Sequence, residues 1–179
     1  MKPIKKSVSG IAMAALVAAG ASSIVTGLAG AAFAADGPRI EGRNLAKAKL
    51  QGKNYSNHSL ENINFSGADL QGADFTGADL SNINFAGANL AGASFHGARL
   101  TNVNLMNTVL ANSNFRSAYA EDTNLISANL TSACFGNAIF KRVAMMNADI
   151  SGAGAPGLQT EAVVPDDIAA ALSSATCAK

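Results

Sequence analysis

The sequence has 179 residues, of which 49% are hydrophobic and 14% are charged, and its formal net charge is +1. The length predicts a single domain, and a charge this close to neutral excludes a strongly basic nucleic-acid-binding surface. Seventeen glycines and only 6% aromatic residues favour thin, repetitive coils over one large globular core.

The first 34 residues are predicted to be a signal peptide. Three lysines among the first six residues precede an apolar, Ala-rich run over 11–32 and the small-x-small pattern Ala32-Phe33-Ala34. A cut after Ala34 would place the mature chain outside the cytoplasm, as a periplasmic, secreted or lumenal protein. The alternative is a retained membrane anchor, because the apolar run approaches the length of a spanning helix.

Residues 40–152 repeat with a period of five. A large apolar residue recurs at every fifth position, a small or β-branched residue stands two positions before it, and Gly or Asn is frequent two positions after it. The pattern misses once, at Ala120. The large residues are Leu45, Leu50, Tyr55, Leu60, Phe65, Leu70, Phe75, Leu80, Phe85, Leu90, Phe95, Leu100, Leu105, Leu110, Phe115, Leu125, Leu130, Phe135, Phe140, Met145 and Ile150.

This period excludes both a straight helix and a straight strand. Five residues advance a helix by about 140° beyond a full turn, so no apolar stripe forms. In a strand, an odd period sends alternate copies to opposite faces. An extended segment that bends once per repeat fits the pattern, because the large residue and the small residue two positions earlier then both point inward. Gly and Asn suit the bend, since they tolerate tight-turn dihedrals.

A second period of twenty residues predicts coils with four sides. Like residues then stack on like: leucines in the column of Leu50, aromatic residues in the column of Tyr55, and mostly Ile or Val in the column of Ile63. An outward column is expected to form hydrogen bonds between its side chains, and its members are Asn44, Asn64, Asn84, Asn104 and Asn124.

The first coil departs from the pattern, because the inward positions at Arg43, Lys53 and His58 are polar. We interpret this coil as an irregular end cap, which solenoids need for solubility. The alternative is a basic surface for an anionic partner, which would also include Arg39 and Lys47.

The repeated pattern, as in Ala68-Asp69-Leu70-Gln71-Gly72, resembles the pentapeptide-repeat family over roughly residues 40–152. The resemblance implies an all-β fold, a right-handed quadrilateral β-helix or solenoid, here with about 5.5 coils of 20 residues. The family has no shared catalytic residues. Its best-known members protect DNA gyrase by imitating DNA, and others are secreted, lumenal or of unknown role. The signal segment predicts that this chain is a secreted member.

The repeats are predicted to stop after Ile150, and residues 151–157 (SGAGAPG) are predicted to form a linker. Pro and two Asp suit the first turn of a helix over 164–175, which we expect to cover the C-terminal end or flank of the solenoid. A frayed tail is the alternative. The predicted domains are a signal peptide at 1–34, an N-terminal tail at 35–39, a solenoid at 40–152, and a linker with a capping helix at 153–179.

No catalytic, cofactor-binding or metal-binding set is predicted. His58 and His96 belong to no Cys/His cluster with metal-ligand spacing. Asp69, Asp74 and Asp79 follow the five-residue period, so they lie on three different sides of one coil and do not converge as acid–base or metal chemistry requires. We therefore expect no enzyme activity, no cofactor, no small-molecule substrate and no nucleic-acid partner.

Two sites are predicted at outward positions. Cys134 and Cys177 are expected to form a disulfide bond, because export permits one, with two separate thiols as the alternative. Met106, Ile126 and Met146 form an outward column that becomes apolar towards the C-terminus. Either the predicted helix or a second chain covers this column, unless these are ordinary scattered surface residues. Dimerisation through C-terminal coils in the resembling family favours a second chain.

The function predicted from these features is an exported, non-enzymatic scaffold or protein-interaction module. Its partner is an unidentified protein or a second copy of the chain, and it contacts a membrane only through an uncleaved signal segment. The alternative is a DNA-mimicking, gyrase-binding protein. Export places the chain in the wrong compartment for that role, and ten Lys or Arg against twelve Asp or Glu after residue 34 give a net charge of only −2.

Overall fold

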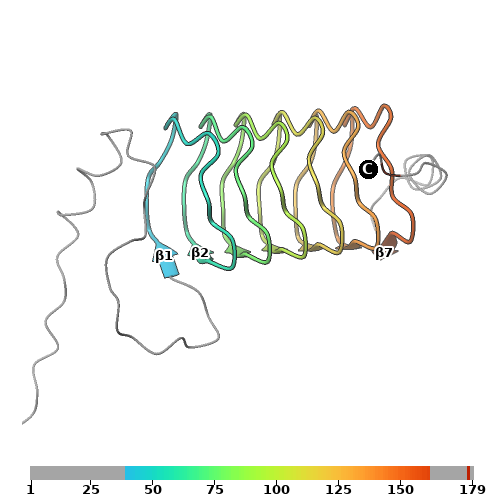
Figure 1. Ribbon diagram of the computed structural model, residues 1–179, viewed down its shortest axis with the longest axis horizontal. Coiled ribbons are helices and arrows are strands. Elements are labelled where there is room, and N and C mark those ends of the chain that lie inside the picture. Colours follow the sequence, from blue (N-terminus) through green and yellow to red (C-terminus); the bar gives the residue numbers. More distant parts are fainter. Residues whose placement is uncertain (1–38, 162–176, 178–179) are drawn as a thin grey trace, which may run out of the picture. The chain divides into compact units, whose positions relative to one another are not determined.

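The computed structural model describes residues 39–161 and Cys177. This part of the chain consists of strands, single bridges and turns, without a helix, and so contains no helix that could cross a membrane. Seven short strands form one parallel sheet in sequence order along one side of the coils (Figure 1). They are β1 (Arg39–Glu41), β2 (Ser59–Glu61), β3 (Asp79–Ser81), β4 (Arg99–Thr101), β5 (Tyr119–Glu121), β6 (Ile139–Lys141) and β7 (Gln159–Glu161).

Each coil contains twenty residues, because every strand pairs with the strand twenty positions later, as Leu60 does with Leu80. Six coils follow β1, from residues 42–61 to residues 142–161. Single-residue parallel bridges with the same offset join the coils on the other three sides, at residues such as Asn44, Lys49 and Asn54. The predicted all-β solenoid with four-sided coils is therefore confirmed, with about six coils instead of about 5.5.

A bend at every fifth residue separates the sides. From Gly42 to Gly157, each fifth residue has a positive φ, between 50° and 74°. These are the positions, two after each large residue, at which the sequence favours Gly and Asn. The bend prediction is confirmed, and it extends to positions with other side chains, such as Lys47 and Arg142.

The core consists of the predicted columns of like residues. Phe95 is fully buried and stacks on Phe75 and Phe115, with ring centroids 5.0 and 4.7 Å away. The column begins at Tyr55, which stacks on Phe75 at 5.1 Å, and reaches Phe135. A parallel ring stack is possible here because successive coils repeat the same backbone position. The interior is thus filled by side chains in register.

The predicted asparagine column also forms. Asn64, Asn84 and Asn104 each donate a side-chain hydrogen bond to the asparagine of the preceding coil, over 3.2 to 3.3 Å. Each side-chain oxygen additionally accepts the backbone N–H two residues later, as that of Asn64 does from Ser66 at 3.0 Å. The column therefore ties neighbouring coils together and closes the turn within each coil.

The first coil is regular in its backbone, contrary to the predicted irregular cap. Asn44, Lys49 and Asn54 make the same bridges as their equivalents in later coils. Arg43 and His58 are half-buried, and the His58 ring nitrogen Nδ1 lies 2.8 Å from the carbonyl oxygen of Ser56. The long side chains at the inward positions are accommodated at the open end of the core, so the bridges are kept.

The C-terminal boundary predicted from the sequence was wrong. Residues 151–157 are not a linker but part of the sixth coil, in which Gly154 bridges to Cys134 and β7 completes the sheet. Gly152 and Gly157 keep the positive φ of the bends, and small inward residues such as Ala153 are buried. The solenoid also begins one residue early, at Arg39. The predicted signal peptide at 1–34 and helix at 164–175 lie outside the described residues.

Candidate functional site

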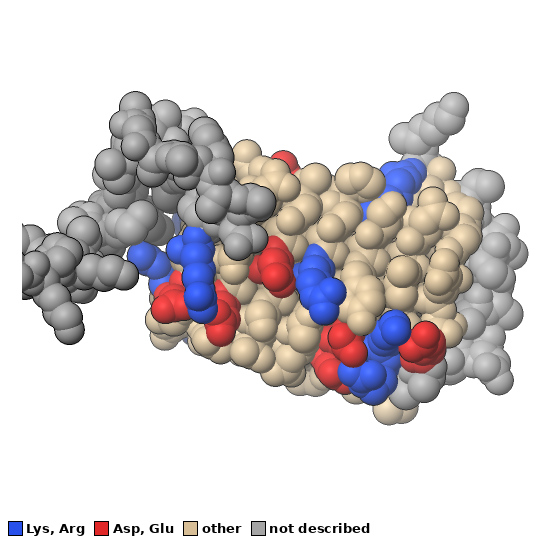
Figure 2. Space-filling model, turned by 90° about the horizontal axis from the view of Figure 1, so that it is seen from below, with Lys and Arg blue, Asp and Glu red and all other residues tan. Residues whose placement is uncertain are grey.

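The sides of the coils differ in charge. Figure 2 shows basic and acidic side chains together on the face seen from below, on the side where Figure 1 places the strands. We call the side formed by β1–β7 the strand face. The side that follows it in each coil carries no Lys, Arg, Asp or Glu after the first coil. We call this side the uncharged face, and its residues are 63–67, 83–87, 103–107, 123–127 and 143–147.

The predicted apolar column lies along one edge of the uncharged face. Met106 and Ile126 are half-buried, and Met146 is 61% exposed. Val109, on the next side, is 41% exposed, and these are the large hydrophobic residues most exposed among those described. The outward direction of the column is as predicted. What covers the column stays a prediction, because the helix expected at 164–175 lies outside the described residues.

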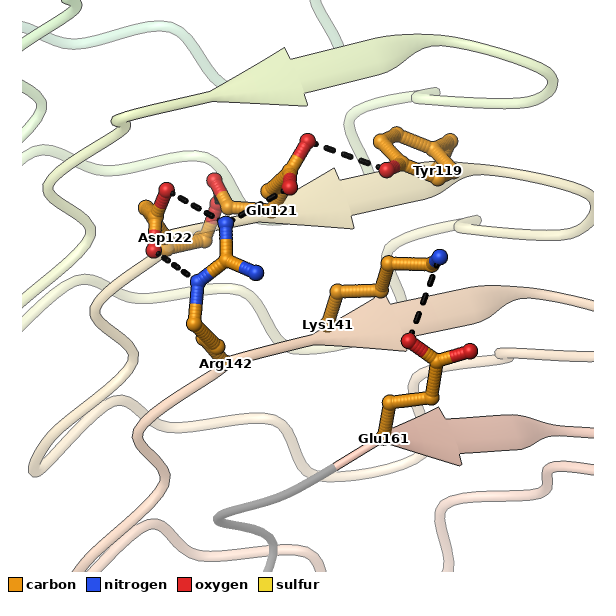
Figure 3. A network of polar contacts seen from close by, with 7 residues as sticks. Tyr119, Glu121, Asp122, Lys141, Arg142 and Glu161 are labelled. Carbon is orange, nitrogen blue, oxygen red and sulfur yellow. Dashed lines mark hydrogen bonds and ion pairs between the residues drawn. The ribbon is translucent and has the colours of Figure 1, made fainter.

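A network of ion pairs on the strand face was not anticipated from the sequence (Figure 3). The Arg142 guanidinium donates to Asp122 from Nε at 2.6 Å and from Nη2 at 2.9 Å, and Nη2 also donates to Glu121 at 2.6 Å. The Tyr119 hydroxyl donates to the other oxygen of Glu121 at 3.0 Å. Four side chains of two successive coils are therefore held together.

Further charges extend this network along the same face. Lys141 pairs with Glu161 at 3.2 Å, and the guanidinium carbon of Arg99 lies 4.7 Å from the centre of the Tyr119 ring. The sequence contains a signal for the Arg142–Asp122 pair, because opposite charges twenty residues apart meet on neighbouring coils.

The network changes the ionisation of its members. Hydrogen bonds from Arg142 lower the pKa of Asp122 and, together with the Tyr119 hydroxyl, the pKa of Glu121. The hydrogen bond to Glu121 in turn raises the pKa of Tyr119. All three groups are accessible to water, so each interaction contributes little by itself. Because these charges satisfy one another, the network serves to join coils and does not form a reactive centre.

The residues with catalytic potential do not converge. Asp69 accepts hydrogen bonds from Gln51 and from Asn89, the latter at 3.1 Å, and Asp74 accepts the backbone N–H of Thr76 at 2.9 Å on a different side. Within residues 39–161 and Cys177, no three His, Cys, Asp or Glu residues are placed to hold a metal ion. His96 is exposed and lies on a different coil from His58.

Cys134 and Cys177 form a disulfide bond in the structure, with their Cα atoms 5.2 Å apart. Cys134 was expected to be accessible at its outward position, but it is only 6% exposed. The chain at Cys177 lies over this side of the solenoid, with its sulfur 3.3 Å from the carbonyl oxygen of Gly154. Whether both thiols are oxidised in the isolated protein stays a prediction for mass spectrometry of the unreduced chain.

The repeats match a known family. The family model described as Pentapeptide repeats matches residues 44–82, 68–105, 104–142 and 123–153, in eight copies. These overlapping matches extend over more than half of the chain. The chain belongs to the pentapeptide-repeat family. The family that the sequence pattern indicated is thereby confirmed.

Solved structures of other pentapeptide-repeat proteins are similar to this chain. HetL of the cyanobacterium Nostoc sp. strain PCC 7120, involved in heterocyst differentiation regulation, is 26% identical over 68% of this chain and 59% of HetL, with a TM-score of 0.48. AT2G44920 from the Arabidopsis thaliana thylakoid lumen is 29% identical over 55% of this chain and 66% of that protein, with a TM-score of 0.33. A trypsin-treated form of QnrB1, a plasmid-mediated fluoroquinolone resistance protein, is 22% identical over 67% and 70%, with a TM-score of 0.28.

This pentapeptide-repeat chain spans less than two thirds of the length of HetL and of AT2G44920. No curated protein matches it. Family membership therefore accounts for the solenoid and its columns. The surface residues, namely the uncharged face, the ion-pair network and the paired cysteines, have to be interpreted from this chain itself.

Proposed function

We propose that this protein is an exported, non-enzymatic pentapeptide-repeat scaffold that binds a protein partner, either an unidentified protein or a second copy of the chain. The uncharged face supports this proposal most. Five successive coils present no Lys, Arg, Asp or Glu there, and its edge ends at Met146, which is 61% exposed. Apolar surface without charge is typical of the centre of a protein–protein contact.

The solenoid also holds this face in a fixed arrangement. Backbone bridges and the Asn64–Asn84–Asn104 hydrogen bonds fix each coil about 4.8 Å from the next. A partner that docks on such a surface orders few side chains, so the entropy cost of binding is low. A scaffold needs this property, whereas an enzyme needs convergent reactive groups.

Two further parts of the proposal concern residues outside the described part. We infer from the sequence that residues 1–34 direct export and are removed, so that the mature chain begins at Ala35. Residues 164–175 are proposed to form a capping helix. N-terminal sequencing of the protein recovered from cell fractions tests the first. Recovery of an intact chain beginning at Met1 in the cytosol would contradict export.

Light scattering on residues 35–179 tests binding to a second copy. We expect a dimer that dissociates in the Ile126→Glu variant, because a carboxylate would be buried in the apolar column without a partner. His96→Glu is the matched control, because His96 is exposed two sides away around the coil. Monomers of unchanged stability in the parent and in Ile126→Glu would exclude both the dimer and a helix folded back over this column.

If the chain is monomeric, the partner is another protein, and the same two variants test it. In a pull-down from envelope and cytosolic extracts, a true partner is lost with Ile126→Glu and retained with His96→Glu. Equal capture by both variants would exclude the uncharged face as the binding surface.

The alternative function is that of a DNA-mimicking protein that binds gyrase. A DNA mimic needs a dense negative surface. Residues 39–161 contain nine Lys or Arg and nine Asp or Glu, so this part of the chain has no net formal charge. We therefore favour the scaffold. A gyrase supercoiling assay with the mature chain decides the matter, and inhibition at stoichiometric concentration would favour the alternative.

A further inference from the structure

The last coil, residues 142–161, has the weakest core of the six. At the positions of the large inward residues it contains Ala155 in the phenylalanine column and Thr160 in the column of Phe140. Ile150 is only partly buried and Thr160 is exposed, whereas the equivalent residues one coil earlier are at most 1% exposed. Less apolar area is therefore removed from water when this coil forms than when any inner coil forms.

Two glycines on one side of the solenoid leave space for Cys177. Gly136 does not have the positive φ of the bend glycines, and earlier coils carry Ser, Thr, His or Arg at its position. A Cβ placed on Gly136 would lie 3.6 Å from the Cys177 sulfur and 3.5 Å from Pro156 Cγ. Gly154 is buried and contacts the same sulfur through its carbonyl oxygen at 3.3 Å. A longer side chain at Gly136 would occupy this space.

The disulfide spans the weak coil. Cys134 precedes it, Cys177 follows it, and the bond closes a loop with a sequence separation of 43 that contains all of residues 142–161. A crosslink restricts the conformations of the unfolded chain within its own loop. In a solenoid each coil contacts only its neighbours, so this restriction stabilises the last coil and leaves the inner coils unaffected.

We propose that the Cys134–Cys177 bond is a redox-sensitive clasp that determines whether the last coil is folded. A dithiol reductant breaks the sulfur–sulfur bond, both cysteines become thiols, and the reductant becomes a disulfide, so that two electrons and two protons are transferred. The last coil then has only its small core and the Lys141–Glu161 ion pair to hold β7 on β6. Its backbone opens locally while the five preceding coils stay folded.

Opening would also alter the uncharged face. Met146, the most exposed apolar residue described, belongs to the last coil. Reduction would therefore remove the end of the proposed binding surface. This consequence rests on the proposed function, whereas the clasp itself does not.

Amide hydrogen exchange of the mature chain, with and without dithiothreitol, tests the clasp. Backbone amides of Asp149, Gly154 and Gln159 are bonded to carbonyls of the preceding coil over 2.9 Å. We expect them to exchange at least about tenfold faster after reduction, as local unfolding predicts. Amides of the third coil, such as Phe85, should not change. Equal protection of the last coil in both redox states overturns the proposal, as does a uniform loss over all coils.

Three variants separate the clasp from its surroundings. The double variant Cys134→Ser, Cys177→Ser should show fast exchange in the last coil with or without reductant. Thr160→Leu adds apolar area to this coil and should slow its exchange in the reduced protein. If the double variant keeps full protection, the coil does not depend on the bond and the proposal fails.

The space beside Gly136 gives an independent test through the number of free thiols. Gly136→Leu fills the place of Cys177 and should raise the fraction of free thiols in protein refolded in air. Ser56→Leu is the matched control, because Ser56 holds the same position in the first coil. An equal thiol count in both variants would show that the glycine does not admit Cys177.

Discussion

At every fifth residue the backbone takes a left-handed conformation, whatever side chain is present. Lys47, Ser127 and Arg142 adopt φ values of 58°, 56° and 50°, close to those of the glycines at equivalent positions. This conformation costs about 1–2 kcal/mol for a residue with a Cβ. The bridges between coils impose it, and Gly or Asn at most of these positions limits the total cost.

Gly72→Ala measures this cost directly. A Cβ at Gly72, where φ is 65°, meets nothing within 4 Å, so the substitution adds backbone strain without a clash. We expect urea denaturation to show a loss of about 1 kcal/mol. Ser127→Gly, the reverse change at another bend, should be neutral or stabilising by up to about 1 kcal/mol. Equal stability of Gly72→Ala and the parent would contradict a strained bend.

Tyr55 is the only member of the aromatic column with a hydroxyl group, and its burial raises its pKa to about 12. The unfolded chain ionises this phenol near pH 10, so folding favours the neutral form. The stability linked to this group is complete below pH 10 and is lost as the pH rises towards 12. In Tyr119→Phe, where Tyr55 is the remaining tyrosine, phenolate absorbance should titrate near 12, and a midpoint near 10 would contradict its burial.

At the scale of the coil, the Arg142 network couples neighbouring coils to pH. The pKa values of Glu121 and Asp122 are lowered, so their contribution is present above the unfolded pKa near 4 and is lost as the pH falls through the lower folded values. Arg142→Gln should therefore reduce the slope of stability against pH in this acidic range. Arg142→Lys keeps the charge without the paired donors and should give an intermediate slope. Identical slopes in all three proteins would show that the network does not contribute.

Most of the coil could be predicted from the sequence, because its periodic pattern fixes local geometry and packing together. The period of five determined the bends, and the period of twenty determined which residues meet on neighbouring coils. Asn84 between Asn64 and Asn104, and Phe95 between Phe75 and Phe115, are therefore placed as expected.

The features that escaped prediction depend on residues that break the pattern. Ala155 and Thr160 replaced the large residues of the last coil, so the coil was interpreted as a linker although Gly152 and Gly157 still marked its bends. Gly136 was taken for an ordinary residue of the repeat, because nothing in the sequence showed that Cys177 lies beside it. Contacts made by a returning chain follow no period, and the sequence therefore does not reveal them.

Over the described solenoid, stability is a sum over neighbouring coils. Each coil contacts the one before and the one after it, so no distant packing compensates for a local defect. A defect in an inner coil should therefore weaken contacts on both of its sides, whereas a defect in the last coil weakens one. This difference explains why the last coil depends on a covalent bond while the inner coils rely on their buried columns.

Phe95→Ala tests the columns as the source of this stability. Phe95 is fully buried between Phe75 and Phe115, and its truncation removes two ring stacks and leaves a cavity, at a cost of about 3–5 kcal/mol. Val109→Ala is the control, because Val109 is 41% exposed and its truncation should change stability by no more than about 0.5 kcal/mol. Urea unfolding followed by circular dichroism measures both, and the folded spectra should show strand and no helical signal from the repeats. Equal losses in the two variants would mean that the phenylalanine column does not form the core in solution.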